Sequence, residues 1–138
     1  PMPSTYSPNL RIELIASGEQ ANTWGNTTNN NLGTLIEQAI AGYTTINVTA
    51  ANVTLTAYDG ASDQARNMIL SIIGTAGTPR AVYTPAGVTK MYVVLNKADA
   101  AITVYCGTIA SHGLGVTVPI NTAYLVICDG TDIIKVTS

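Results

Sequence analysis

Apolar residues follow two different periods along this chain, and the period changes near residue 43. Between residues 32 and 40 they recur at three- and four-residue spacing, which is typical of one face of an amphipathic helix. From Tyr43 onward apolar and polar residues alternate, as in Ile46-Asn47-Val48 and Val53-Thr54-Leu55, which is typical of half-buried strands. The alternation predicts about eight or nine short strands, the pattern of a sandwich or barrel.

The helical pattern predicts one short helix with a single apolar stripe. Asn29, Asn30 and Asn31 offer possible N-caps, and Gly42 stands where a glycine would end the helix. A helix of about 11 residues is too short to be stable alone. Its stripe therefore packs either in the core of its own module or in a bundle with equivalent helices of neighbouring subunits. The stripe contains Leu32, Leu35, Ile36, Ala39 and Ile40.

The segment before the helix shows a proline-rich start followed by a short alternation. Residues 1–9 hold three prolines and predict an extended arm. Residues 10–15 alternate apolar and charged side chains, which predicts a half-buried strand. This strand has no hairpin partner next to it in the sequence, so pairing with another subunit is open to it. We therefore divide the chain into residues 1–42, for anchoring and oligomerisation, and a compact β module of residues 43–138.

Two features of the β module are specific enough to locate. Residues 68–73 (MILSII) are nearly continuously apolar, as expected of a strand covered on both faces. The pair Asp129-Gly130 predicts a tight hairpin between the last two strands. The fold class expected is mainly β: a small antiparallel β-sandwich or barrel-like module, preceded by an extended arm and one short helix.

Charged residues are scarce in this sequence, and their scarcity favours an assembly protein over a nucleic-acid-binding protein. Charged residues make up 10% of the chain, and the net charge is −2. A surface of uncharged Thr, Asn, Ser and Gly repels sister copies weakly, which favours an assembly subunit. The six basic residues form no patch, so we expect no nucleic-acid partner. There is no run of about 18 apolar residues and no signal-peptide pattern, so we expect a protein made in the cytosol, with no membrane partner.

The residues that usually carry chemistry are few and scattered. His112 is the single histidine and lies in a glycine-containing loop, away from any metal-ligand pattern. Cys106 and Cys128 lie in apolar runs, which favours buried, inert thiols over a disulfide. Asp59 and Asp63 flank a turn whose spacing departs from that of a calcium-binding loop. No nucleophile, phosphate-binding or Cys-x-x-Cys motif is present, so we expect no enzyme, no cofactor and no metal.

One segment of the chain resembles a known family. Residues 18–25 (GEQANTWG), with Thr27, Thr28, Asn29 and Asn31 after them and residues 36–43 (IEQAIAGY) next, resemble the opening of tailed-bacteriophage fibre-type proteins. The resemblance continues through residues 55–56, 65–68 and 116–119. It ends at residues 125–131 (LVICDGT), which look like the closing hairpin of that family.

The resemblance implies a structural protein of a phage virion. Members are virion proteins, typically tail fibres, and phage fibres and decoration proteins are usually trimers. This chain shows one module without shaft repeats, which favours a surface fibre, spike or capsid decoration subunit. The alternatives are a receptor-binding tail-fibre subunit and a carbohydrate-binding module of a non-viral protein. The implied place is the virion surface, after synthesis in the host bacterial cytoplasm.

The implied partners follow from that place. They are sister copies in a homotrimer, capsid or tail proteins, and a host-surface glycan at outward loops such as residues 108–115. Trp24 is the candidate anchor, with a buried ring and a bonded indole N–H. The candidate intersubunit or module-packing stripe consists of Leu32, Leu35, Ile36 and Ile40.

Overall fold

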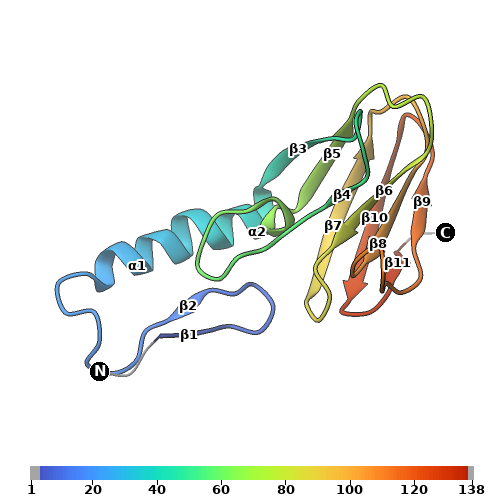
Figure 1. Ribbon diagram of the computed structural model, residues 1–138. Coiled ribbons are helices and arrows are strands. Elements are labelled where there is room, and N and C mark those ends of the chain that lie inside the picture. Colours follow the sequence, from blue (N-terminus) through green and yellow to red (C-terminus); the bar gives the residue numbers. More distant parts are fainter. Residues whose placement is uncertain (1–3, 137–138) are drawn as a thin grey trace.

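The computed structural model describes residues 4–136 and shows a β-sandwich from which a helix and a two-stranded ribbon project together (Figure 1). The expectation of a mainly β protein with one helix is confirmed, since 38% of residues lie in strands and 16% are helical. Among the described residues, the chain starts in the ribbon beside the helix and ends at the sandwich (Figure 1).

The sandwich consists of two sheets of unequal size. The five-stranded sheet contains, in spatial order, β11 (Ile133–Lys135), β10 (Thr122–Asp129), β7 (Thr89–Asn96), β5 (Ile69–Ile73) and β3 (Tyr43–Asn47). The four-stranded sheet contains β4 (Val53–Thr54), β6 (Arg80–Thr84), β8 (Ile102–Cys106) and β9 (Val116–Val118). A short 3-10 helix, η2 (Gln64–Arg66), precedes β5.

From β3 to β8 the chain alternates between the two sheets, and each return places the next strand parallel to the previous one. Thus β3, β5 and β7 are parallel neighbours, and so are β4, β6 and β8. Only the pairs β7–β10, β10–β11 and β8–β9 of the sandwich are antiparallel. The expectation of a wholly antiparallel module is therefore wrong. The reason is that apolar alternation has the same period in both kinds of ladder.

The core lies between the two sheets and is filled by one side of each strand. Leu70, Val94 and Val126 point inward from the larger sheet, and Ile102 and Val104 from the smaller one, all fully buried. The hairpin expected at Asp129-Gly130 is confirmed between β10 and β11. Gly130 has a φ of +98°, a conformation that favours glycine.

The helix is longer than the sequence predicts. It runs over 18 residues, as α1 (Trp24–Asn30), the π-helical segment η1 (Asn31–Ile36) and α2 (Glu37–Ala41). The predicted N-caps Asn29, Asn30 and Asn31 therefore lie inside the helix, and that prediction is wrong. The predicted end before Gly42 is confirmed. A Cβ on Gly42 would lie 2.3 Å from Oδ1 of Asn67, so the helix turns into β3 where only glycine fits.

The arm folds back on its own chain. β1 (Thr5–Tyr6) and β2 (Glu13–Leu14) form an antiparallel ribbon that runs beside the helix (Figure 1). The strand expected at residues 10–15 is shorter than predicted, and its partner is β1 rather than another subunit. Residues 1–3 of the expected arm lie outside the described residues.

Candidate assembly surfaces

The ribbon is held to the loop before η2 by a buried arginine. Arg66 donates from Nε to the carbonyl oxygen of Ala61 at 2.9 Å and from Nη2 to that of Tyr58 at 2.6 Å. Its Nη1 donates to the carbonyl oxygen of Leu10, at the tip of the ribbon. Burial lowers the pKa of this guanidinium, while Asp63 and Asp59 oppose that effect. One side chain thus joins the ribbon to the loop before η2.

An ion pair strengthens the same junction at its surface. Arg11 Nε donates to Oδ1 of Asp59 at 2.6 Å, and the backbone N–H of Gly60 donates to the carbonyl oxygen of Arg11 at 2.8 Å. The guanidinium lowers the pKa of the Asp59 carboxyl. Asp63 accepts hydrogen bonds from the Thr56 hydroxyl and from backbone N–H groups. Both carboxylates of the calcium-like turn are thus engaged by the protein itself.

The helix has one face toward its own protomer and one face toward solvent. Asn31 bonds to both backbone groups of Glu13, and Gln38 donates to the hydroxyl of Ser62. Leu35 lies on the same face and is fully buried. The predicted stripe is therefore divided, because Leu35 packs inside the protomer.

The remaining apolar residues of the helix form a separate exposed row. Leu32 is 59% exposed and Ile40 is 72% exposed, and Ile36 between them is half-buried. These three residues are spaced four apart and lie on one face of the helix. We call Leu32, Ile36 and Ile40 the helix stripe. Within the described residues it has no apolar cover comparable to that of Leu35.

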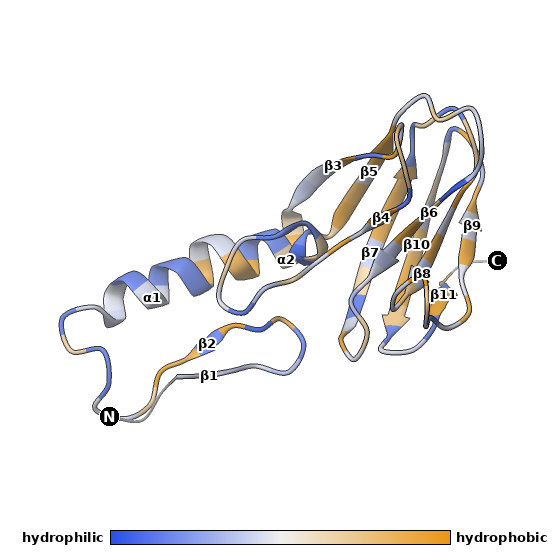
Figure 2. Cartoon of the chain, in the orientation of Figure 1, coloured by the Kyte–Doolittle hydropathy of each residue, from blue (hydrophilic) through white to orange (hydrophobic). Residues whose placement is uncertain are grey.

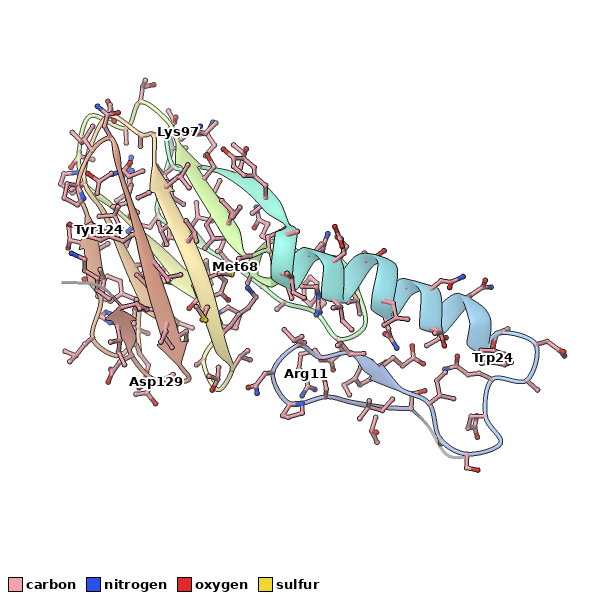
Figure 3. All side chains as sticks on the ribbon, turned by 180° about the vertical axis from the view of Figure 1, so that it is seen from behind. Arg11, Trp24, Met68, Lys97, Tyr124 and Asp129 are labelled. Carbon is pink, nitrogen blue, oxygen red and sulfur yellow. The ribbon has the colours of Figure 1, made fainter. Side chains whose placement is uncertain are left out.

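Trp24 begins the helix at the end far from the sandwich (Figure 3). Its side chain is 60% exposed. The protomer therefore does not provide the buried anchoring site predicted for this ring. A large exposed ring at the tip of a projecting helix is available to another molecule.

The outer face of the five-stranded sheet is also apolar. Alternate residues of its strands point into the core, and the residues between them point outward. Figure 2 shows β5, β7 and β10 coloured hydrophobic along most of their length. We call this surface the apolar face. Its apolar members are Ile69, Ile73, Met91, Val93, Leu95, Leu125, Ile127 and Ile134, and the buried Ser71 lies among them beside Leu95.

The outer face of the four-stranded sheet has a different chemistry. The hydroxyls of Thr103 and Thr117 lie 2.8 Å apart across β8 and β9. The rings of Tyr83 and Tyr105 stack at 5.5 Å between centroids, and the exposed His112 lies 4.1 Å from Tyr105. A pocket of about 280 Å³ next to His112 is lined by loop residues and by Cys106. The expected exposed loop position of His112 is confirmed, but its aromatic neighbours were not predicted.

The two cysteines are buried, as the sequence predicts. Cys106 and Cys128 are each 1% exposed, and their Sγ atoms lie 2.9 Å apart in the core. Burial and the neighbouring Cys128 raise the pKa of Cys106 to about 12. Within residues 4–136 no group of three His, Cys, Asp or Glu side chains is placed to hold a metal ion. No helix in the described part of the chain is long and apolar enough to cross a membrane.

Comparisons with protein-family models, curated proteins and solved structures find no match to this chain. The candidate site is defined by the structure itself, as the helix stripe, the exposed Trp24 and the apolar face. Sequence reasoning missed the apolar face, although residues 68–73 gave a signal for it. A strand that is apolar on both sides needs cover on both sides.

Proposed function

We propose that this protein is a non-enzymatic structural subunit of a tailed-bacteriophage virion, and that it assembles as a homotrimer through its projecting helix. Within the virion it serves as a surface fibre, spike or capsid decoration subunit. The observation that carries the proposal is the exposed helix stripe. The resemblance of residues 18–43 to phage fibre-type proteins supports the virion context.

The length and pattern of the helix favour self-association. The helix comprises 18 residues, enough for several turns to pack along a neighbour. The helix stripe recurs every four residues along the exposed side, as Leu32, Ile36 and Ile40, so one row of apolar side chains is presented to a neighbouring helix.

The junction and the low charge also support an assembly role. The end of the helix is fixed to the sandwich by two backbone hydrogen bonds, from Met68 N–H to the carbonyl oxygen of Gln38 at 3.0 Å and from Ile69 N–H to that of Gly42 at 2.9 Å. Parallel association of three helices would therefore place three sandwiches at one end of the assembly. Few surface charges oppose this close approach, because only 10% of residues are charged.

The mass of the protein in solution tests the proposed trimer. We expect the wild-type chain at micromolar concentration to have three times its 14.3 kDa mass. Leu32→Asp with Ile40→Asp should reduce this to a single chain, because both side chains would bring charge into the helix contact. The matched control is Asn26→Asp with Ala41→Asp, which adds the same charge at exposed positions outside the stripe. Light scattering measures the mass, and circular dichroism checks that the fold persists. A monomeric wild-type protein would overturn the proposal.

A second measurement tests the virion context independently. Antibodies against the sandwich, applied to particles of a phage that carries this gene, should label the particle surface in electron micrographs. Absence of the chain from purified particles by mass spectrometry would overturn the virion assignment and leave the trimer to the first experiment.

A further inference from the structure

We propose that the apolar face of the five-stranded sheet is buried against sister copies in the same trimer, so that the subunits contact each other through their sandwiches as well as their helices. This inference rests on the proposed self-assembly and names a second surface for it.

The apolar face is built from adjacent rows rather than scattered side chains. The ladders place Leu125 beside Val93, and Val93 beside Ile69. A second row joins Ile134, Ile127 and Met91. A sheet face that normally meets water alternates to polar residues, as it does on Thr-rich strands. Here the outward positions of β5, β7 and β10 are mostly apolar, with Ser71 as the polar exception within β5, which is typical of a face that is covered.

The two outer faces of the sandwich differ in chemistry, and only that of the five-stranded sheet is mainly apolar. The outward positions of the four-stranded sheet include Thr103 and Thr117, whose hydroxyls form a hydrogen bond. They also include the stacked Tyr83 and Tyr105. One outer face is therefore suited to water, and the other is not.

The apolar face provides one part of a contact that it shares with the helix stripe. Met91 and Ile134 are nearly half-exposed, and the other six apolar residues of the face are half-buried. The face alone therefore exposes less area than the roughly 800 Å² that each partner contributes to a standard interface, and the exposed Leu32 and Ile40 of the helix stripe add to it.

Charge and position both indicate a sister copy as the occupant. None of the eight apolar residues of the face is charged, and the nearby ammonium of Lys97 lies at its edge, 3.4 Å from the hydroxyl of Tyr43, so identical faces meet with little like-charge repulsion. Tyr43, next to Ile69 in the ladder, continues the face to the edge strand β3. Ile40 of the helix stripe lies three residues before it. The apolar face thus continues the surface through which the helices are proposed to associate.

A pair of opposite charges placed on adjacent strands tests the inference. Val93→Lys with Leu125→Glu makes the face polar while the two side chains can pair across β7 and β10. The net charge stays unchanged. We expect the molar mass at micromolar concentration to fall from three chains to one, with the circular dichroism of the sandwich retained.

The control repeats the design on the other outer face. Thr103→Lys with Thr117→Glu places the same charged pair on directly opposed residues of β8 and β9. This variant should remain trimeric. Its dissociation would show that any charged pair on a sheet disrupts the assembly, and would overturn the assignment to the apolar face.

Oxidation of Met91 gives a readout on the unmodified face. Hydrogen peroxide transfers one oxygen atom to the thioether sulfur and leaves water. Met91 is 44% exposed in the protomer, so peptide mass spectrometry should show at least roughly tenfold slower oxidation in the wild-type trimer than in the Leu32→Asp, Ile40→Asp monomer. This result stands even if the charged-pair variant fails to fold.

The outcomes separate the two proposals. A wild-type trimer in which Met91 reacts as fast as in the monomer would overturn this inference alone, and would mean that another virion component or solvent meets the face. A wild-type monomer would overturn the proposed function and this inference together.

Discussion

Lys90 is the least expected side chain in the core. It lies on the inward side of β7 and is 9% exposed. Its ammonium donates to the carbonyl oxygens of Asn67 and Met91, at 3.2 and 3.0 Å, and lies 4.4 Å from the centre of the Tyr92 ring. Burial, with a contribution from the nearby Arg66, lowers the pKa of Lys90 from 10.5 to about 8. The folded protein thus holds this charge less favourably than water does.

This lowered pKa predicts a specific dependence of stability on pH. Below about pH 8 both folded and unfolded chains carry the charge, so the full cost of burying it is present. As the pH rises from about 8 to 10.5, the folded chain loses the proton first and the cost disappears. Between about pH 7 and 9.5 the free energy of unfolding should rise by about 2 kcal/mol on account of this residue.

The Lys90→Met variant isolates that contribution. Urea unfolding of both proteins, in the monomeric Leu32→Asp, Ile40→Asp background, avoids coupling to dissociation. The gain between the two pH values should be smaller in the variant by about 2 kcal/mol. Parallel pH profiles for the two proteins would contradict the prediction.

At the scale of elements, the start of the helix shows where sequence reasoning ends. Residues 24–31 contain mostly Asn, Thr and Gly, which are weak helix formers without an apolar period. They are helical because Asn30 bonds to the carbonyl oxygen of Gly60 and Asn31 bonds to Glu13. These partners are distant in sequence, so local propensity could not predict the first turns.

The strands and the stripe were predicted in part, for related reasons. Alternation predicted about eight or nine strands for the β module, and its described residues form the nine strands β3 to β11, but alternation could not give their partners. The helical period grouped Leu35 with Leu32, although only Leu35 meets the protomer. The sequence shows that apolar residues cover a broad side of the helix. It does not show which of them are buried, because that depends on tertiary contacts.

The ribbon should detach when its buried arginine is removed. Arg66→Met leaves three carbonyl groups without their donor, including that of Leu10 in the ribbon. We expect cleavage by trypsin after Arg11 to become at least about tenfold faster, because the ribbon opens more often. Timed digestion with mass spectrometry measures the rate.

Arg80 provides the matched control for this experiment. It also donates to backbone carbonyls, those of Val48 and Thr49, but it does so away from the ribbon. Arg80→Met should leave the cleavage rate after Arg11 unchanged. Equal acceleration in both variants would mean that global stability, rather than the Arg66 junction, controls the ribbon.

For the whole molecule, the near absence of charge on the helix stripe and the apolar face predicts an assembly that is insensitive to salt. Screening weakens contacts between exposed charges, and the proposed interface contains none in these two surfaces. Between about 0.05 and 1 M sodium chloride, the trimer dissociation constant should change by less than about threefold. Sedimentation equilibrium at several salt concentrations measures it. A steep loss of trimer with salt would indicate that ion pairs hold the copies together.

The alternation of the chain between the two sheets also has a kinetic consequence. Strand β3 can form its ladder only after β5 has been made, because Tyr43 pairs with Ile69. In the same way β5 needs β7, because Ile69 pairs with Val93. Each such pairing requires closure of a long loop, so the sandwich should form slowly. The first turns of the helix bond to Glu13 and Gly60, so they are completed only when the ribbon and the loop before η2 are in place. We therefore expect the apolar face, which combines strands far apart in the sequence, to be completed last.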